Sequence, residues 1–122
     1  MPDMPKFEKS PAELAERFAA VMDRVAFQGP GVTRKKMFGY PSAFVNGHMA
    51  TGLHGSSWFV RLAASSLAEL LASGLGRPFE PMPGRPMKGY VVLAPETVSD
   101  DEAIDAWVAA ALAFTASLPP KV

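Results

Sequence analysis

The sequence predicts an α+β fold, with helices at both ends of an antiparallel sheet. Three Ser-x-x-Glu motifs, each typical of a helix N-terminus, precede apolar residues at the spacing of one helix face. Between the first two motifs, short segments of alternating residues are separated by glycine-containing turns, which is typical of strands. Because the links are short, consecutive strands must run antiparallel. The expected order is a helix, a four-stranded meander, a short helix, a long Pro/Gly loop, a fifth strand and a closing helix.

The first helix is expected to begin at the motif Ser10-Pro11-Ala12-Glu13, where Pro11 stands at a position that does not need its N–H. Gly29-Pro30-Gly31 is expected to end it. The apolar side chains between these signals fall on one stripe, formed by Leu14, Phe18, Val21, Met22 and Val25.

Four strands are expected at residues 33–38, 42–45, 48–54 and 58–62. Asn46-Gly47 is the strongest hairpin signal, because both residues tolerate the positive φ of a type I′ turn. Alternation predicts a helix-facing side made of Met49, Thr51, Leu53, Trp58, Val60 and Leu62. The opposite side then shows His48, Ala50, Gly52, His54, Phe59 and Arg61. This second side has room for a partner, a ligand or the long loop.

A short helix is expected to start at Ser66-Leu67-Ala68-Glu69 and to end at Gly74. Residues 74–87 contain four prolines and three glycines, which excludes a regular element, and we expect this loop to pack on the domain through Phe79 and Met82. A fifth strand follows at residues 89–94, and Ser99-Asp100-Asp101-Glu102 is expected to cap the last helix. The apolar face of that helix comprises Ile104, Trp107, Val108, Ala111, Leu112 and Thr115. Both Trp58 and Trp107 are therefore expected to be substantially buried.

The composition is that of one soluble globular domain, expected over residues 1–122 with its core at about 10–118. Hydrophobic residues make up 48% and charged residues 20% of the chain. No apolar run approaches the ~18 residues that cross a bilayer. The first ten residues do not resemble a secretory signal, and there is no cysteine. A cytoplasmic protein without a membrane partner is expected.

Charge is unevenly distributed although the net charge is zero. Residues 32–94 carry seven basic and two acidic side chains, a net +5, whereas residues 95–122 carry one basic and five acidic side chains, a net −4. This asymmetry has two interpretations. The basic region could attract an anionic partner, or the two regions could attract each other within the fold.

No motif in the chain indicates catalysis or metal binding. His48 and His54 are expected on the same face of one strand, with Cα atoms roughly 20 Å apart, too far to share a metal. Ser56 and Ser57 lack the flanking glycines of a nucleophile elbow. The loop before Gly89 lacks the Lys-Ser/Thr ending of a phosphate-binding loop. We expect no enzymatic activity, no cofactor and no metal.

The basic triplet Arg34-Lys35-Lys36 lies on an expected strand, where alternation divides it between two faces. One interpretation is a charged edge strand that protects the sheet. The other is a contribution to binding of nucleic acid or a small anion. Across the chain, the candidate interaction residues are Arg34, Lys36, His48, Phe59, Arg61, Arg85 and Lys88.

Five segments, taken in order, resemble one known family. They are Lys36-Met37-Phe38-Gly39, residues 44–50 (FVNGHMA), residues 84–90 (GRPMKGY), Trp107-Val108 and residues 117–121 (SLPPK). Over about residues 14–121 the chain resembles the N-terminal domain family of TfoX, also called Sxy, a regulator of bacterial competence. The resemblance implies an α+β fold similar to small type III secretion-chaperone-like domains, and it supplies no catalytic residues. Longer members have a second, helical domain, so this chain is expected to be a short single-domain form.

Two functions are expected as alternatives. The first is that of a non-catalytic protein that acts by protein–protein association, for example in the regulation of competence or transcription. The second is weak nucleic-acid or small-anion binding through Arg34, Lys36, Arg61, Arg85 and Lys88; tight nucleic-acid binding is not expected without a second domain. A homodimer is expected, because the open sheet has edges and an uncovered face, and because the chaperone-like folds that the family resembles tend to dimerise.

Overall fold

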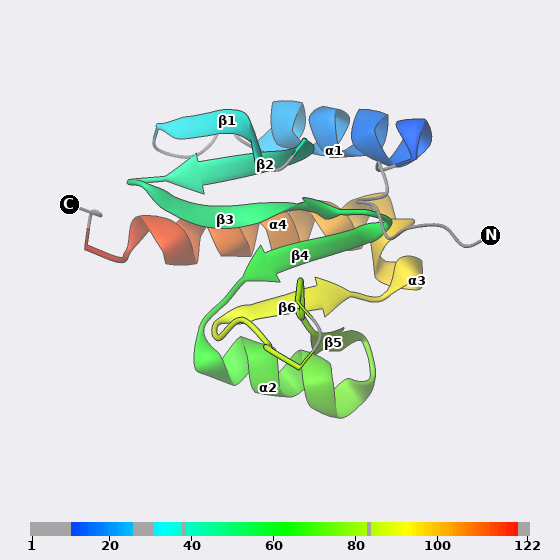
Figure 1. Cartoon of the computed structure of the whole chain (residues 1–122), viewed down its shortest axis with the longest axis vertical. Coiled ribbons are helices and arrows are strands. Elements are labelled where there is room, and N and C mark those ends of the chain that lie inside the picture. The colour runs from blue at the N-terminus through cyan, green and yellow to red at the C-terminus, as the bar shows by residue number, and fades with distance from the viewer. Residues whose placement is uncertain (1–10, 26–30, 38, 83, 120–122) are drawn as a thin grey trace.

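The computed structural model describes residues 11–25, 31–37, 39–82 and 84–119. It has the predicted α+β class, with one antiparallel sheet in the strand order β1-β2-β3-β4-β6-β5. The strands are β1 (Val32–Met37), β2 (Tyr40–Val45), β3 (His48–His54), β4 (Ser57–Arg61), β5 (Gly76–Pro78) and β6 (Tyr90–Leu93). The helices are α1 (Ala12–Val25), α2 (Ala64–Ser73), α3 (Pro95–Val98) and α4 (Asp101–Ala116). Helices α1 and α4 lie on one face of the sheet, and α2 lies beside β5 and β6 (Figure 1).

Strand β5 is a correction to the sequence analysis, which excludes a regular element from residues 74–87. Its three residues pair with β6 at the end of the sheet. A Cβ atom on Gly76 would lie 2.7 Å from Cγ2 of Val91 and 3.1 Å from Cβ of Leu70, so only glycine lets the backbone approach this closely. Pro78, which has no N–H, ends the strand. The short helix α3, which the sequence did not indicate, follows β6 and begins with Pro95.

The helix starts differ in part from the Ser-x-x-Glu motifs. Ser10 lies outside the described residues. Helix α2 begins at Ala64 and its N-cap is Ala63, so the motif at Ser66 lies inside the helix and caps nothing. At α4 the N-cap is Asp100, whose carboxylate accepts hydrogen bonds from the N–H groups of Glu102 and Ala103. Its neighbour Ser99 donates instead to the carbonyl of Glu96 in α3.

The predicted turn residues have the expected backbone conformations. Asn46 and Gly47 have φ values of 54° and 85°, as a type I′ hairpin requires. Gly74 ends α2 in the left-handed region, and its N–H contributes to the cap. These local signals are confirmed.

The main core lies between the sheet and helices α1 and α4. Trp58 is at its centre, with 1% of its surface exposed and its ring centroid 5.1 Å from that of Phe18. Its Nε1 donates to Oγ1 of Thr51 at 3.0 Å, and this hydroxyl donates in turn to the carbonyl of Phe59 at 2.8 Å. The burial of Trp58 is as predicted, whereas Trp107 is only partly buried at the margin of this core.

A bulge in β3 changes the predicted alternation. Ala43 pairs with Thr51 but Phe44 pairs with Met49, which leaves Ala50 without a direct partner on β2. Ala50 consequently packs in the main core and Met49 on the opposite face, the reverse of the predicted sides. One extra residue in a strand moves the side chains of all the residues before it to the opposite face of the sheet.

The second face of the sheet has its own apolar cluster, formed by Phe59, Phe79, Tyr90 and Val92 with Met49 and Met87 packed against it. Phe79 belongs to a segment that we call the strap (residues 79–87, of which residue 83 lies outside the described part). The strap closes on itself, because the N–H of Met87 donates to the carbonyl of Phe79 at 2.8 Å. The Phe79 ring stacks on Phe59, with centroids 4.2 Å apart and planes 13° from parallel.

The strap confirms half of the prediction for this loop. Phe79 is buried against the sheet, whereas Met82 is 62% exposed. A β-bridge between Met82 and Arg85 forms the tip of the strap, and the side chain of Met82 is exposed to solvent there.

No helix among the described ranges is long and apolar enough to cross a membrane.

Candidate functional site

Two of the predicted interaction residues, Arg34 and Lys36, lie on the edge strand β1. Arg34 donates to the carboxylate of Asp23 on α1, with Nη1 and Oδ1 2.7 Å apart. Lys35, between them, points to the other face, where its Nζ lies 4.7 Å from the centroid of the Phe44 ring. All three basic residues are exposed. The triplet is therefore divided between two faces, as alternation predicts.

Phe59 and Arg61 lie on β4, on the second face of the sheet. Phe59 is buried beneath Phe79 of the strap. The Arg61 guanidinium lies over the Tyr90 ring at 5.4 Å from the centroid, and its Nη1 donates to the Tyr90 hydroxyl at 3.3 Å. That hydroxyl donates to the carbonyl of Met49 at 2.7 Å. Arg61 thus links β4 to β6 and β3 through the Tyr90 hydroxyl, and the strap covers Phe59.

The remaining predicted residues lie in three different places. Arg85 is exposed at the tip of the strap, and Lys88 is exposed just after it. His48 contacts the carbonyl of Pro119 through Nε2 at 2.7 Å, beyond the end of α4. His54 instead contacts Tyr40 and Phe79 on the second face. The two histidines therefore face opposite sides of the sheet, which corrects the prediction that they share one.

The seven predicted residues do not form one surface. Arg34 and Lys36 lie at one edge of the sheet, and β2 and β3 separate them from Arg61 on β4. A single anion-binding patch that includes all five basic candidates is therefore not present in this arrangement. The structure keeps Arg34, Lys35 and Lys36 together on β1, divided between its two faces and with Arg34 paired to Asp23.

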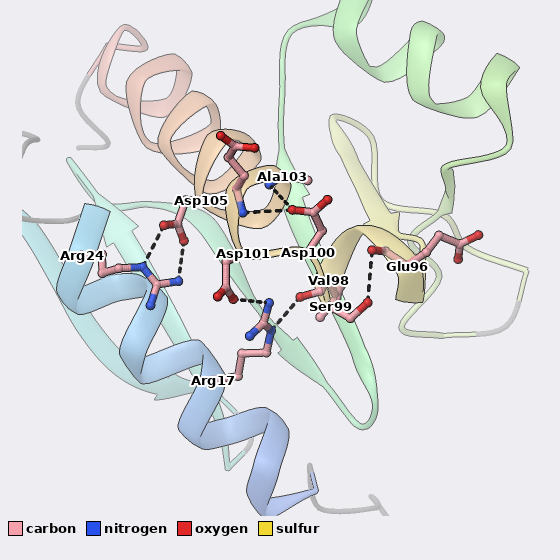
Figure 2. A network of polar contacts seen from close by, with 10 residues as sticks. Arg17, Arg24, Glu96, Val98, Ser99, Asp100, Asp101, Ala103 and Asp105 are labelled. Atoms are coloured by element: carbon pink, nitrogen blue, oxygen red, sulfur yellow. Dashed lines mark hydrogen bonds and ion pairs between the residues drawn. The ribbon is translucent and has the colours of Figure 1, made fainter.

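Ion pairs join α1 to the acidic start of α4 (Figure 2). Arg17 donates through Nε to the carbonyl of Val98 at 2.6 Å, and its Nη2 lies 2.8 Å from Oδ1 of Asp101. Arg24 binds Asp105 through two hydrogen bonds of 2.8 and 2.7 Å. The acidic region at residues 95–122 is thus paired in part with the first helix. Neither interpretation of the charge asymmetry predicts this pairing between α1 and α4. The basic region at residues 32–94 retains exposed cationic side chains.

The pair of Arg24 and Asp105 predicts a pH dependence of stability. The hydrogen bonds from Arg24 hold the pKa of Asp105 below its ordinary value of 3.8, against the opposing effect of desolvation. A carboxylate whose pKa is lowered on folding stabilises the protein above its unfolded pKa, and this contribution is lost as pH falls through the folded pKa.

We therefore expect the substitution Asp105→Asn to lower the urea midpoint at pH 7, and expect the difference from the parent to shrink as the pH falls below about 4. The effect is modest because both side chains are partly exposed. Urea titrations at pH 7 and at pH 3 measure it. The same substitution made in an Arg24→Gln background is the control and should have little effect at either pH. A loss of stability that is independent of Arg24 would contradict the prediction.

Two half-open cavities lie beside α1. The larger, of about 600 Å³, is lined by residues that include Leu14, Arg17, Ser57, Arg77 and Glu96. Arg77 donates to the Ser57 hydroxyl at 2.9 Å, and Arg17 is held by Val98 and Asp101, so both guanidinium groups already have partners in the fold. The smaller, of about 250 Å³, lies between α1 and the β1–β2 hairpin. The larger cavity contains none of the predicted site residues.

Helix α4 carries an uncharged outer surface that the sequence analysis missed. Ala106, Ala109, Ala110 and Ala113 are exposed at helical spacing. The partly buried Trp107 and Phe114 belong to the same helix, and no charged residue occurs between residues 106 and 119. We call these six residues the α4 surface. The sequence carries the signal for this surface as alanines at positions i, i+3, i+4 and i+7.

Together these features define a class of small α+β protein in which two helices pack on one face of an antiparallel sheet and an aromatic strap covers part of the other. Within the described ranges, no group of three His, Cys, Asp or Glu side chains is placed to hold a metal ion. The chain belongs to the TfoX N-terminal domain family, whose sequence model matches residues 23–115 of the 122. No curated protein and no solved structure gives a significant match.

Proposed function

We propose that this protein is a non-catalytic, cytoplasmic module of the TfoX N-terminal type that acts by protein–protein association, in the regulation of competence or transcription. The observation that supports the proposal is the α4 surface. A helix segment without charged residues on any side is usually buried, yet the outer side of α4 is exposed along its last three turns, where no residue is charged. A protein partner would remove the exposed apolar side from water.

The partner that this surface fits best is a second copy of the chain. Alanine side chains allow two helices to approach closely, and helix pairs commonly pack 8–10 Å apart, depending on the residues at the contact. A two-fold axis across α4 would align two copies of the helix antiparallel. Each acidic start, at Asp101 and Glu102, would then lie beside the uncharged end of the other helix, which avoids repulsion between like charges.

This surface replaces the reason for dimerisation that the sequence suggested. There, Phe59 and its small neighbours were expected to form an uncovered face. The strap covers that face, because Phe79 stacks on Phe59 and both rings are at most 4% exposed. The uncharged, exposed side of α4 is therefore the proposed dimer interface, in place of the second face of the sheet.

Sedimentation equilibrium at micromolar concentration tests the proposal. We expect the protein to sediment at twice the monomer mass of 13.0 kDa. The substitution Ala110→Lys should raise the dimer dissociation constant at least tenfold, because a charge would be buried without a partner. Ala20→Lys is a matched control at an exposed alanine of α1, and it should leave the dimer intact. A parent protein that sediments at the monomer mass would contradict self-association.

A further inference from the structure

The outer edge of strand β1 is paired with no other strand of the described residues. All six of its residues pair in unbroken register with β2 on one side, and the sheet order places no strand on the other. The opposite edge of the sheet is different, because β5 has three residues and ends at Pro78. Natural sheets commonly keep edges short or interrupt them with proline. Strand β1 is the one long regular edge of the described sheet.

The register of β1 shows which backbone groups face the open side. Lys36 lies opposite Pro41, which has no N–H and cannot take part in a doubly hydrogen-bonded pair. The N–H and C=O of Lys36 therefore point away from β2, and by alternation so do those of Arg34. These are the groups that would hydrogen-bond to an added strand.

The side chains of β1 leave space for such a strand. Every residue from Thr33 to Met37 is exposed, so the side chains of the edge are accessible to an added strand on both faces. The cavity of about 250 Å³ beside it is lined by the basic triplet itself, by Ala15, Phe18 and Ala19 of α1 and by Pro41 and Ser42 of β2. A strand added at β1 would direct alternate side chains toward this cavity, which is how sheet-edge recognition obtains specificity.

The positive charge of β1 indicates which kind of strand could pair with its open edge. Arg34, which is bound to Asp23, and Lys36 project on the α1 side, and Lys35 projects on the other, so Lys36 and Lys35 present a cation to an added strand on each face. In a two-fold pairing centred on Lys35, this residue would face its own copy and Arg34 would face Lys36. Like charges directly opposite each other destabilise a strand pair, whereas opposite charges stabilise it. The edge therefore rejects a second copy of itself and favours an acidic strand.

We propose that β1 binds an extended, acidic segment of a partner protein as a seventh strand of the sheet, with consecutive carboxylates opposite Arg34, Lys35 and Lys36. This inference rests on the proposed function of protein–protein association, and it assigns a surface distinct from the α4 surface. A peptide fits the site better than a nucleic acid for two reasons. The edge offers backbone donors and acceptors in strand spacing, and its three cations are divided between two faces.

The test uses a blocked ten-residue peptide of alternating Thr and Val with Asp-Glu-Asp at its centre. Fluorescence anisotropy should show it binding the full-length protein at least tenfold more tightly than the same peptide with Asn-Gln-Asn at its centre. Lys36→Glu should weaken binding of the acidic peptide at least tenfold. Lys88→Glu, at an exposed lysine beyond the strap, is the matched control and should have little effect. Neither variant should change the sedimentation mass, so failure of peptide binding is distinguished from failure of self-association.

Amide hydrogen exchange separates strand addition from a diffuse attraction of charges. In the saturated complex, exchange of the Arg34 and Lys36 N–H groups should slow at least tenfold, because those groups become hydrogen-bonded. Unchanged exchange at both positions would overturn the proposal. Equal affinity for the acidic and the neutral peptide would also overturn it, as would equal or tighter binding of a ten-nucleotide oligothymidylate.

Discussion

Replacement of Trp58 by alanine is expected to lower the free energy of unfolding by about 4 kcal/mol, within the range of buried Trp→Ala substitutions. The indole has 1% of its surface exposed, so its removal leaves a cavity in the centre of the main core. It also removes the contact with Phe18 and the hydrogen bond to Thr51. A loss of this size is a large part of the 5–15 kcal/mol typical of a domain, so this variant is expected to be folded only marginally.

Trp58→Phe keeps the prediction measurable in a folded protein. It retains an aromatic ring beside Phe18 but removes the donor to Thr51, and it should lower the free energy of unfolding by about 1–2 kcal/mol. Leu71→Ala, at a leucine of α2 that is 44% exposed, is the control and should cost at most about 0.5 kcal/mol. Urea denaturation followed by circular dichroism gives all three values. Equal midpoints for the phenylalanine variant and the leucine control would contradict the central role of Trp58.

The second large effect is expected for Phe79→Ala, which should lower the free energy of unfolding by about 3 kcal/mol, at the lower end for buried Phe→Ala. Phe79 contacts three aromatic side chains of the second face, namely Phe59, Tyr90 and His54. Its removal uncovers Phe59 and detaches the strap from the sheet. Met82→Ala, in the same strap but 62% exposed, is the matched control and should be close to neutral.

Limited proteolysis gives an independent measure of the strap. The bonds after Arg77 and Arg85 precede proline and resist trypsin, so the sensitive site in this region is the exposed Lys88. We expect trypsin to cleave after Lys88 at least tenfold faster in the Phe79→Ala variant than in the Met82→Ala variant or the parent. Rapid cleavage of the parent at Lys88 would show that the strap does not hold this segment against the sheet.

Much of the fold could be predicted because its signals are local. The apolar stripe of α1, the Asn46-Gly47 hairpin and the glycine at the end of α2 each depend on residues that are close in sequence. The prediction failed where a local signal competed with another one nearby. The Ser66 motif is an example, since α2 already begins at Ala64. At α4, Asp100 provides the cap, and the neighbouring Ser99 donates to α3 instead.

The candidate site was predicted less well, because its properties depend on contacts between distant segments. Alternation alone could not reveal the bulge at Ala50, which arises from the pairing of β2 with β3. That bulge places His48 and His54 on opposite faces. In β4 alone, Phe59 would lie on the surface of the sheet. It is buried because Phe79 of the strap, a residue distant in sequence, stacks on it. The α4 surface became visible once the structure showed which side of the helix faces the core.

By itself, the sequence determined the α+β class, the antiparallel order of the first strands, the division of the basic triplet between two faces and membership of the TfoX N-terminal domain family. Each depends on periodicity, turn chemistry or ordered motifs, which are properties of neighbouring residues. The tertiary structure alone decided which charges are engaged within the fold and which edge of the sheet stays open. Arg24 is bound to Asp105 and Arg34 to Asp23, whereas β1 keeps an unpaired side because the described part of the chain supplies no further strand there. Such outcomes follow from side chains of separate elements competing for the same space and the same partners, which no local pattern encodes.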